Sequence, residues 1–122
     1  MTKQEALEII EAQIERLPDR MSGAQEDPIL LPRLKGLVQT ERSAVVQVLR
    51  DWIGLRIPQR ERQPGDGLRV YRMWLALKMV QTFGIRELSQ DIEALLGAIQ
   101  RGDTFLPYYE EMIRKYLPSA IE

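Results

Sequence analysis

The chain contains neither cysteine nor histidine among its 122 residues. The absence of cysteine excludes disulfide bonds, thiolate zinc sites and thiol nucleophiles. The absence of histidine removes the side chain that most often acts as a general base, together with a common metal ligand. Catalysis would have to use carboxylates, lysine, tyrosine or hydroxyl groups. We therefore expect a protein that is not an enzyme, with no catalytic residues, no metal site and no cofactor.

Long hydrophobic runs are also absent. The longest one, Met73–Leu77, has five residues, whereas a helix needs about 20 apolar residues to cross a bilayer. The first ten residues, MTKQEALEII, carry acidic side chains and a helical pattern, unlike the basic start and apolar run of a signal peptide. We expect a cytoplasmic protein with no membrane-spanning segment.

The composition is that of a globular domain. Hydrophobic residues make up 44% of the chain and charged residues 29%, which is typical of an ordinary folded protein. A chain of this length fits one domain and buries enough apolar surface to be stable without disulfides. We expect a single domain covering residues 1–122.

The apolar residues recur with helical spacing, and no stretch alternates as a strand would. This pattern predicts an all-α fold of five to six helices in antiparallel hairpins. The helices are expected at residues 3–17, about 28–39, 41–53, 68–83, 87–100 and from about 104 onward.

The helix at residues 68–83 is expected to be the central one. Eleven of its sixteen residues are apolar, and they are spread around nearly the whole circumference. A helix that is apolar on most sides is normally enclosed by its neighbours. Asp66 can cap its first turn, and Gly84 can adopt the left-handed conformation that ends a helix.

Different features of the sequence predict the first two helices, at residues 3–17 and about 28–39. Thr2 and Glu5 have the spacing of a capping box, and the following apolar seam can pack on the protein's own core or pair helix 3–17 with a second copy of the chain. Residues 18–28 read as a loop. Asp27 is expected to cap a second helix that begins at Pro28 and that Pro32 bends or restarts.

The helices also show a weak repeat. Leu30, Leu68 and Leu106 recur every 38 residues near the starts of alternate helices, and helix pairs with a period of about 40 are typical of HEAT and armadillo repeats. The segment from Arg69 to Ile99 resembles a HEAT-type hairpin through Arg72, Trp74, Ala76, Leu77, Gly84, Leu88, Ile92, Leu95 and Ile99. The resemblance implies a concave surface that binds protein or nucleic acid. A compact helical bundle is the alternative architecture.

The middle of the chain is basic although the net charge is −1. Residues 50–78 hold seven basic and three acidic side chains, and guanidinium groups suit carboxylates and phosphates because they donate two parallel hydrogen bonds. These arginines can instead pair with acidic residues of the same chain. The candidate partner-binding arginines are Arg50, Arg56, Arg60, Arg62, Arg69 and Arg72.

Tyr108 is a further candidate, because it falls outside the apolar face of the last predicted helix and tyrosine is a frequent binding anchor. We expect a non-enzymatic adaptor or regulatory domain that binds an acidic protein through these residues. The alternative is a nucleic-acid-binding domain that uses the same arginines, although the sequence pI of 5.6 is low for that function. A third alternative, an enzyme that uses carboxylates alone, has no convergent pair in the sequence to support it.

Overall fold

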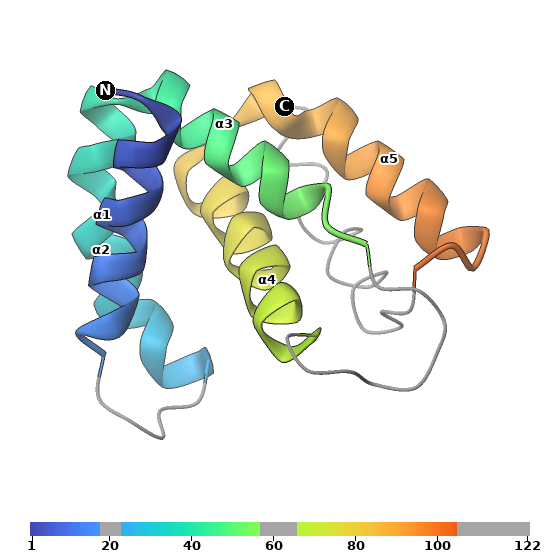
Figure 1. Cartoon of the computed structure of the whole chain (residues 1–122), viewed down its shortest axis with the longest axis horizontal. Coiled ribbons are helices and arrows are strands. Elements are labelled where there is room, and N and C mark those ends of the chain that lie inside the picture. The colour runs from blue at the N-terminus through green and yellow to red at the C-terminus, as the bar shows by residue number, and fades with distance from the viewer. Residues whose placement is uncertain (18–22, 57–65, 105–122) are drawn as a thin grey trace. The chain divides into compact units, whose positions relative to one another are not determined.

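The computed structural model describes residues 1–17, 23–56 and 66–104 of the chain. Within these ranges all regular structure is helical (Figure 1). The elements are α1 (Lys3–Glu15), α2 (Gly23–Thr40), α3 (Arg42–Ile53), α4 (Asp66–Phe83), a 3-10 helix η1 (Arg86–Leu88) and α5 (Ser89–Gln100). The predicted all-α fold is confirmed. The last predicted helix falls on residues 105–122, outside the described part.

Two compact units divide the chain, Met1–Val48 and Leu49–Glu122, and α3 passes from the first into the second. The single domain expected for residues 1–122 stays a prediction. None of the described helices is long and apolar enough to cross a membrane.

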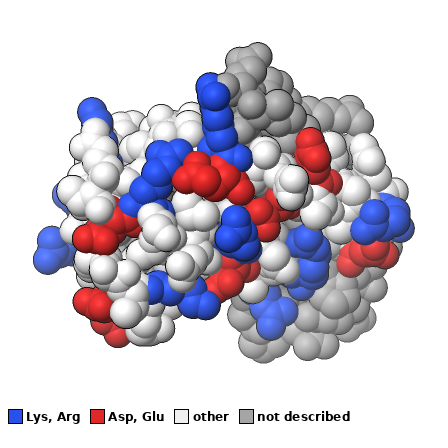
Figure 2. All heavy atoms as spheres, turned by 90° about the horizontal axis from the view of Figure 1, so that it is seen from above, with Lys and Arg blue, Asp and Glu red and all other residues white. Residues whose placement is uncertain are grey.

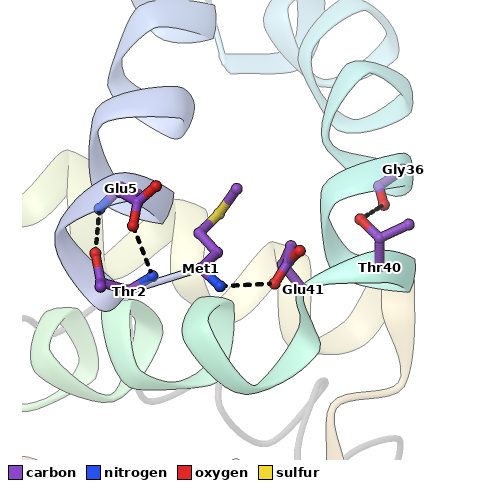
Figure 3. A network of polar contacts seen from close by, with 6 residues as sticks. All are labelled: Met1, Thr2, Glu5, Gly36, Thr40 and Glu41. Carbon is purple, nitrogen blue, oxygen red and sulfur yellow. Dashed lines mark hydrogen bonds and ion pairs between the residues drawn. The ribbon is translucent and has the colours of Figure 1, made fainter.

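The start of α1 has the predicted capping box (Figure 3). The hydroxyl of Thr2 accepts a hydrogen bond from the backbone N–H of Glu5 at 3.1 Å. The carboxylate of Glu5 accepts one from the backbone N–H of Thr2 at 3.2 Å. The helix ends at Glu15, before the expected Leu17, because a residue that precedes a proline is disfavoured in the helical conformation.

Helices α1 and α2 contact each other and run antiparallel in the first unit (Figure 1). Their buried side chains recur every four residues along one face: Ala6 and Ile10 in α1, and Leu30, Leu34 and Val38 in α2. Leu7 and Ile14 of α1, and Leu17 beyond its end, continue the apolar seam of the sequence and are only partly buried. Pairing of two copies through this helix stays a prediction.

The predicted loop is wrong for residues 23–28, which are helical, and the predicted start of α2 at Pro28 is wrong as well. Residues 18–22 of that loop lie outside the described part. Helix α2 begins at Gly23 and contains both Pro28 and Pro32. A proline inside a helix removes one backbone hydrogen bond, and both of these prolines are exposed. Helices in proteins gain most of their stability from tertiary packing, and here the buried face of α2 outweighs the local breaking signal.

The junction of α2 and α3 is nearly continuous. The backbone N–H of Glu41 donates to the carbonyl of Leu37 at 2.8 Å. The hydroxyl of Thr40 donates back to the carbonyl of Gly36 at 2.9 Å (Figure 3). The backbone nitrogen of Met1 lies 3.5 Å from the Glu41 carboxylate. The contact of Met1 with Glu41 places the residue before α1 beside the end of α2 within the first unit.

Helix α4 confirms the predicted helix at residues 68–83 and begins earlier, at Asp66. Its buried positions are Met73, Leu75, Ala76, Leu77, Met79 and Val80, which span about 200° of the circumference at 3.6 residues per turn. The helix is therefore enclosed on more than half of its surface. Trp74 lies on the remaining side and is partly buried, with the Lys78 ammonium 4.8 Å from its ring centroid.

Glycines follow the ends of α4 and α5, and the sequence predicts this role for Gly84. Gly84 after α4 has φ +62° and Gly102 after α5 has φ +78°, a left-handed conformation that glycine adopts without steric cost. Beyond each glycine the chain bonds back to its helix: Ile85 donates to Val80 at 3.1 Å and Asp103 to Ala98 at 2.9 Å. This is the Schellman arrangement, and it positions the residues that follow each helix.

Candidate functional site

Arg50 lies in the last turn of α3 and contacts the next helices of the second unit. Its Nε atom is 3.3 Å from the carboxylate of Asp91 in the first turn of α5. Its Nη2 atom donates to the carbonyl of Glu87 at 3.4 Å. The Arg50 side chain remains 49% exposed. It therefore links α3 to α5 while about half of its side chain remains exposed.

Arg56 follows the end of α3 and caps it. Its Nη1 atom donates to the carbonyls of Ile53 at 2.6 Å and Leu55 at 3.0 Å. The last carbonyls of a helix lack partners in the helix and carry partial negative charge, so a cation is favourable there. Burial lowers the pKa of Arg56 below its ordinary value, and the positive charge of Arg101 lowers it further.

Arg72 in α4 lies over the ring of Trp52 in α3, with its Cζ atom 5.7 Å from the ring centroid. Trp52 is only 4% exposed, so the contact is a cation–π interaction at the edge of the core. Arg69 is exposed and is not without a partner in the chain. The other predicted site residues, Arg60, Arg62 and Tyr108, lie outside the described residues.

Arg101 is a cationic residue that the sequence analysis missed. It follows α5, and its Nε atom donates to the carboxylate of Asp103 at 3.0 Å. Arg101 belongs to the acidic C-terminal part of the chain rather than to the basic middle, so the distribution of charge along the sequence does not single it out. A signal was available, since cations are favoured near the last carbonyls of a helix, just before its terminal glycine.

The described arginines donate to a carboxylate and to backbone carbonyl groups of their own chain. Among residues 1–17, 23–56 and 66–104, no group of three or more acidic residues is placed to hold a metal ion. Asp91, an acidic side chain of the site, is already paired with Arg50. Basic and acidic side chains are interspersed on the face shown in Figure 2. What the site offers is a set of guanidinium groups held by their own chain.

Compared with models of known protein families, with curated proteins and with solved structures, the chain has no significant match. The resemblance of residues 69–99 to a HEAT-type hairpin therefore stays a prediction.

Proposed function

We propose that the chain is a non-enzymatic interaction domain, acting as an adaptor or regulator, that binds an acidic protein through guanidinium groups of its second unit. Arg50 and Arg56 carry the proposal. Each is held by its own chain through some of its N–H groups and retains others for a partner.

The hydrogen bonds of Arg50 and Arg56 to their own chain favour binding of a partner, because they fix the positions of the two side chains. A guanidinium group has five N–H donors, and both described bonds of Arg56 start from its Nη1 atom. Arg50 uses Nε and one N–H of Nη2 toward Asp91 and Glu87. A side chain that is already ordered loses less conformational entropy when it binds a partner. The own-chain contacts thus support the proposal as well as the stability of the fold.

An acidic protein suits the surface better than nucleic acid does. The net charge is −1, and the basic side chains in Figure 2 alternate with acidic ones. Binding to the nucleic-acid backbone depends on neutralising many phosphates in a row. A protein partner needs only a few carboxylates placed opposite Arg50 and Arg56, and this local charge complementarity determines which partner binds.

The proposal can be tested with two labelled probes, poly-glutamate and double-stranded DNA, by fluorescence anisotropy over a series of salt concentrations. We expect poly-glutamate to bind at low salt and the double variant Arg50→Gln/Arg56→Gln to bind it more weakly. Arg33→Gln, an exposed arginine of α2, is the control and should bind like the wild type. Tighter binding of DNA, with a steep loss of affinity as salt rises, would favour the nucleic-acid alternative instead.

A further inference from the structure

The guanidinium group of Arg50 has two edges on which a carboxylate can bind. The group is planar, and neighbouring N–H groups pair along one edge at Nε and Nη2 and along the other at Nη1 and Nη2. Each edge can hold both oxygens of a carboxylate in two parallel hydrogen bonds. The edge that faces its own chain and the edge that stays open therefore determine how a partner reaches Arg50.

The edge at Nε and Nη2 is occupied by the chain itself. Nε of Arg50 lies 3.3 Å from each of the two carboxylate oxygens of Asp91, so that carboxylate is centred on this single N–H group. Nη2 donates to the backbone carbonyl of Glu87 at 3.4 Å. Glu87 belongs to η1 and Asp91 to the first turn of α5. Two acceptors thus hold the plane of the guanidinium group at two points.

The edge at Nη1 and Nη2 is the one that remains for a partner. Within the described part of the chain, no hydrogen bond of Arg50 starts from Nη1, and Nη2 makes one bond although it has two N–H groups. The side chain is 49% exposed. Because the two edges of a planar guanidinium group point in different directions, the second can receive a ligand while the first stays bonded to Glu87 and Asp91.

We propose that a carboxylate of the acidic partner binds end-on to Arg50, at Nη1 and Nη2, and that Asp91 is the positioning residue that keeps this edge open. The inference rests on the proposed function and specifies the geometry of one of its contacts. Asp91 stays bonded to Nε while the partner is bound, so the two carboxylates use different donors. The order that Asp91 imposes on Arg50 reduces the conformational entropy lost on binding.

A pair of parallel donors distinguishes Arg50 from a simple positive charge. Lysine carries the same charge, but its ammonium group has no planar pair of donors. Arg50→Lys should therefore weaken poly-glutamate binding nearly as much as Arg50→Gln does, measured by fluorescence anisotropy at low salt. Arg33→Lys in α2 is the matched control and should bind like the wild type. Wild-type affinity in Arg50→Lys would show that Arg50 acts by charge alone and would overturn the end-on geometry.

A pair of variants at Asp91 separates position from charge. Asp91→Asn and Asp91→Ala both remove one negative charge, but asparagine retains a carbonyl oxygen that can accept the Nε–H of Arg50. Asp91→Ala should bind poly-glutamate about two- to tenfold more weakly than Asp91→Asn, the range expected when one long side chain has to be ordered on binding. Equal affinity of the two variants would contradict the positioning role of Asp91.

Two controls distinguish positioning of Arg50 from a general effect on the fold. Glu93→Gln and Glu93→Ala change an exposed acidic residue of the same helix, and they should bind poly-glutamate alike. In the Arg50→Gln background, Asp91→Asn and Asp91→Ala should also bind alike, because no guanidinium group remains to be positioned. A difference that persists in this background would mean that Asp91 acts through the fold, and it would overturn the proposal.

Side-chain ¹H–¹⁵N NMR signals of Arg50 show whether Asp91 stays bonded. When the full-length chain is titrated with poly-glutamate, the Nη–H signals should shift more than the Nε–H signal, because the partner binds at Nη1 and Nη2. A larger shift of the Nε–H signal would show that the partner displaces Asp91, which contradicts the proposed geometry.

The outcomes separate this inference from the proposed function. If Arg50→Gln loses poly-glutamate binding while Asp91→Asn and Asp91→Ala bind alike, the inference fails and the function stands. If the wild-type chain binds no poly-glutamate at low salt, the proposed function fails, and the inference fails with it.

Discussion

At the scale of single residues, the ion pair of Arg50 and Asp91 joins positions 41 residues apart in the chain. The two side chains are 49% and 27% exposed, and ion pairs with this exposure contribute about 0.2–1 kcal/mol. We predict a coupling energy in that range from a double-mutant cycle of Arg50→Gln and Asp91→Asn, measured by urea unfolding. A coupling energy of zero would mean that Asp91 does not hold Arg50 in place.

The capping box of α1 gives a second prediction at this scale. The Thr2 hydroxyl accepts the backbone N–H of Glu5, and replacement of a capping threonine by alanine costs about 1 kcal/mol. Thr2→Ala should lower the free energy of unfolding by that amount. Thr82→Ala, at an exposed position inside α4, is the control and should cause no loss, because alanine is the better helix former.

The same box predicts a dependence on pH. Hydrogen bonds from the backbone and then from the side chain of Thr2 hold the pKa of Glu5 below its ordinary value of 4.5. A carboxyl group whose pKa is lowered by folding stabilises the fold above its unfolded pKa, and this stabilisation is lost as the pH falls through the folded pKa. The wild type should therefore be more stable than Glu5→Gln at neutral pH. The difference should shrink below pH 4.5 in urea unfolding monitored by circular dichroism; a constant difference would contradict this prediction.

At the scale of the helix, two exposed glycines should respond in opposite ways to alanine. Gly36 lies inside α2 with free space around it, so Gly36→Ala should stabilise the protein by about 0.5–1 kcal/mol. Gly84 has φ +62°, a conformation that costs an L-residue about 1–2 kcal/mol, so Gly84→Ala should destabilise it. Thermal or urea unfolding gives both values, and the same sign for both variants would refute the prediction.

Helices with a strong apolar stripe could be predicted from the sequence. The residue at which α2 begins could not. The end of α4 at Gly84 follows from the left-handed preference of glycine. The start of α2 was mispredicted because Pro28 and Asp27 read as a first turn, while the buried face of Leu30, Leu34 and Val38 keeps the helix intact through both prolines. The start of α2 therefore depends on packing between residues that are distant in the chain, and such packing cannot be recognised from the residues around Pro28.

At the scale of the whole molecule, the basic segment of the sequence includes Arg50 and Arg56, whose contacts the structure describes, but does not include Arg101. Arg50 and Arg56 lie at the end of α3 as their positions in the sequence suggest. Arg50 is bonded to a carboxylate 41 residues away, and Arg56 is bonded to carbonyl groups near the end of α3. Neither partner can be identified from the sequence, because each contact depends on the folded chain. Arg101 could not be identified in this way, because it lies in a segment whose net charge is negative.

The two compact units allow a test of the predicted single domain. Both tryptophans, Trp52 and Trp74, belong to the unit that begins at Leu49, whereas α1 and α2 belong to the other. Fluorescence therefore reports on one unit and circular dichroism on both. Since α3 continues through the boundary, we predict coincident urea transitions for the two signals, as expected for one cooperative domain. Separate midpoints would show two independently folding units.

The most direct test of the central claim is quantitative affinity capture from lysate of the source cells, with the wild-type chain and the charge-reversal variant Arg50→Glu/Arg56→Glu compared by mass spectrometry. Arg33→Glu serves as the control for a change of net charge outside the proposed surface. Our account predicts that the wild type and the control retain an acidic protein that the double variant loses. Retention of every associated protein by all three chains would contradict it.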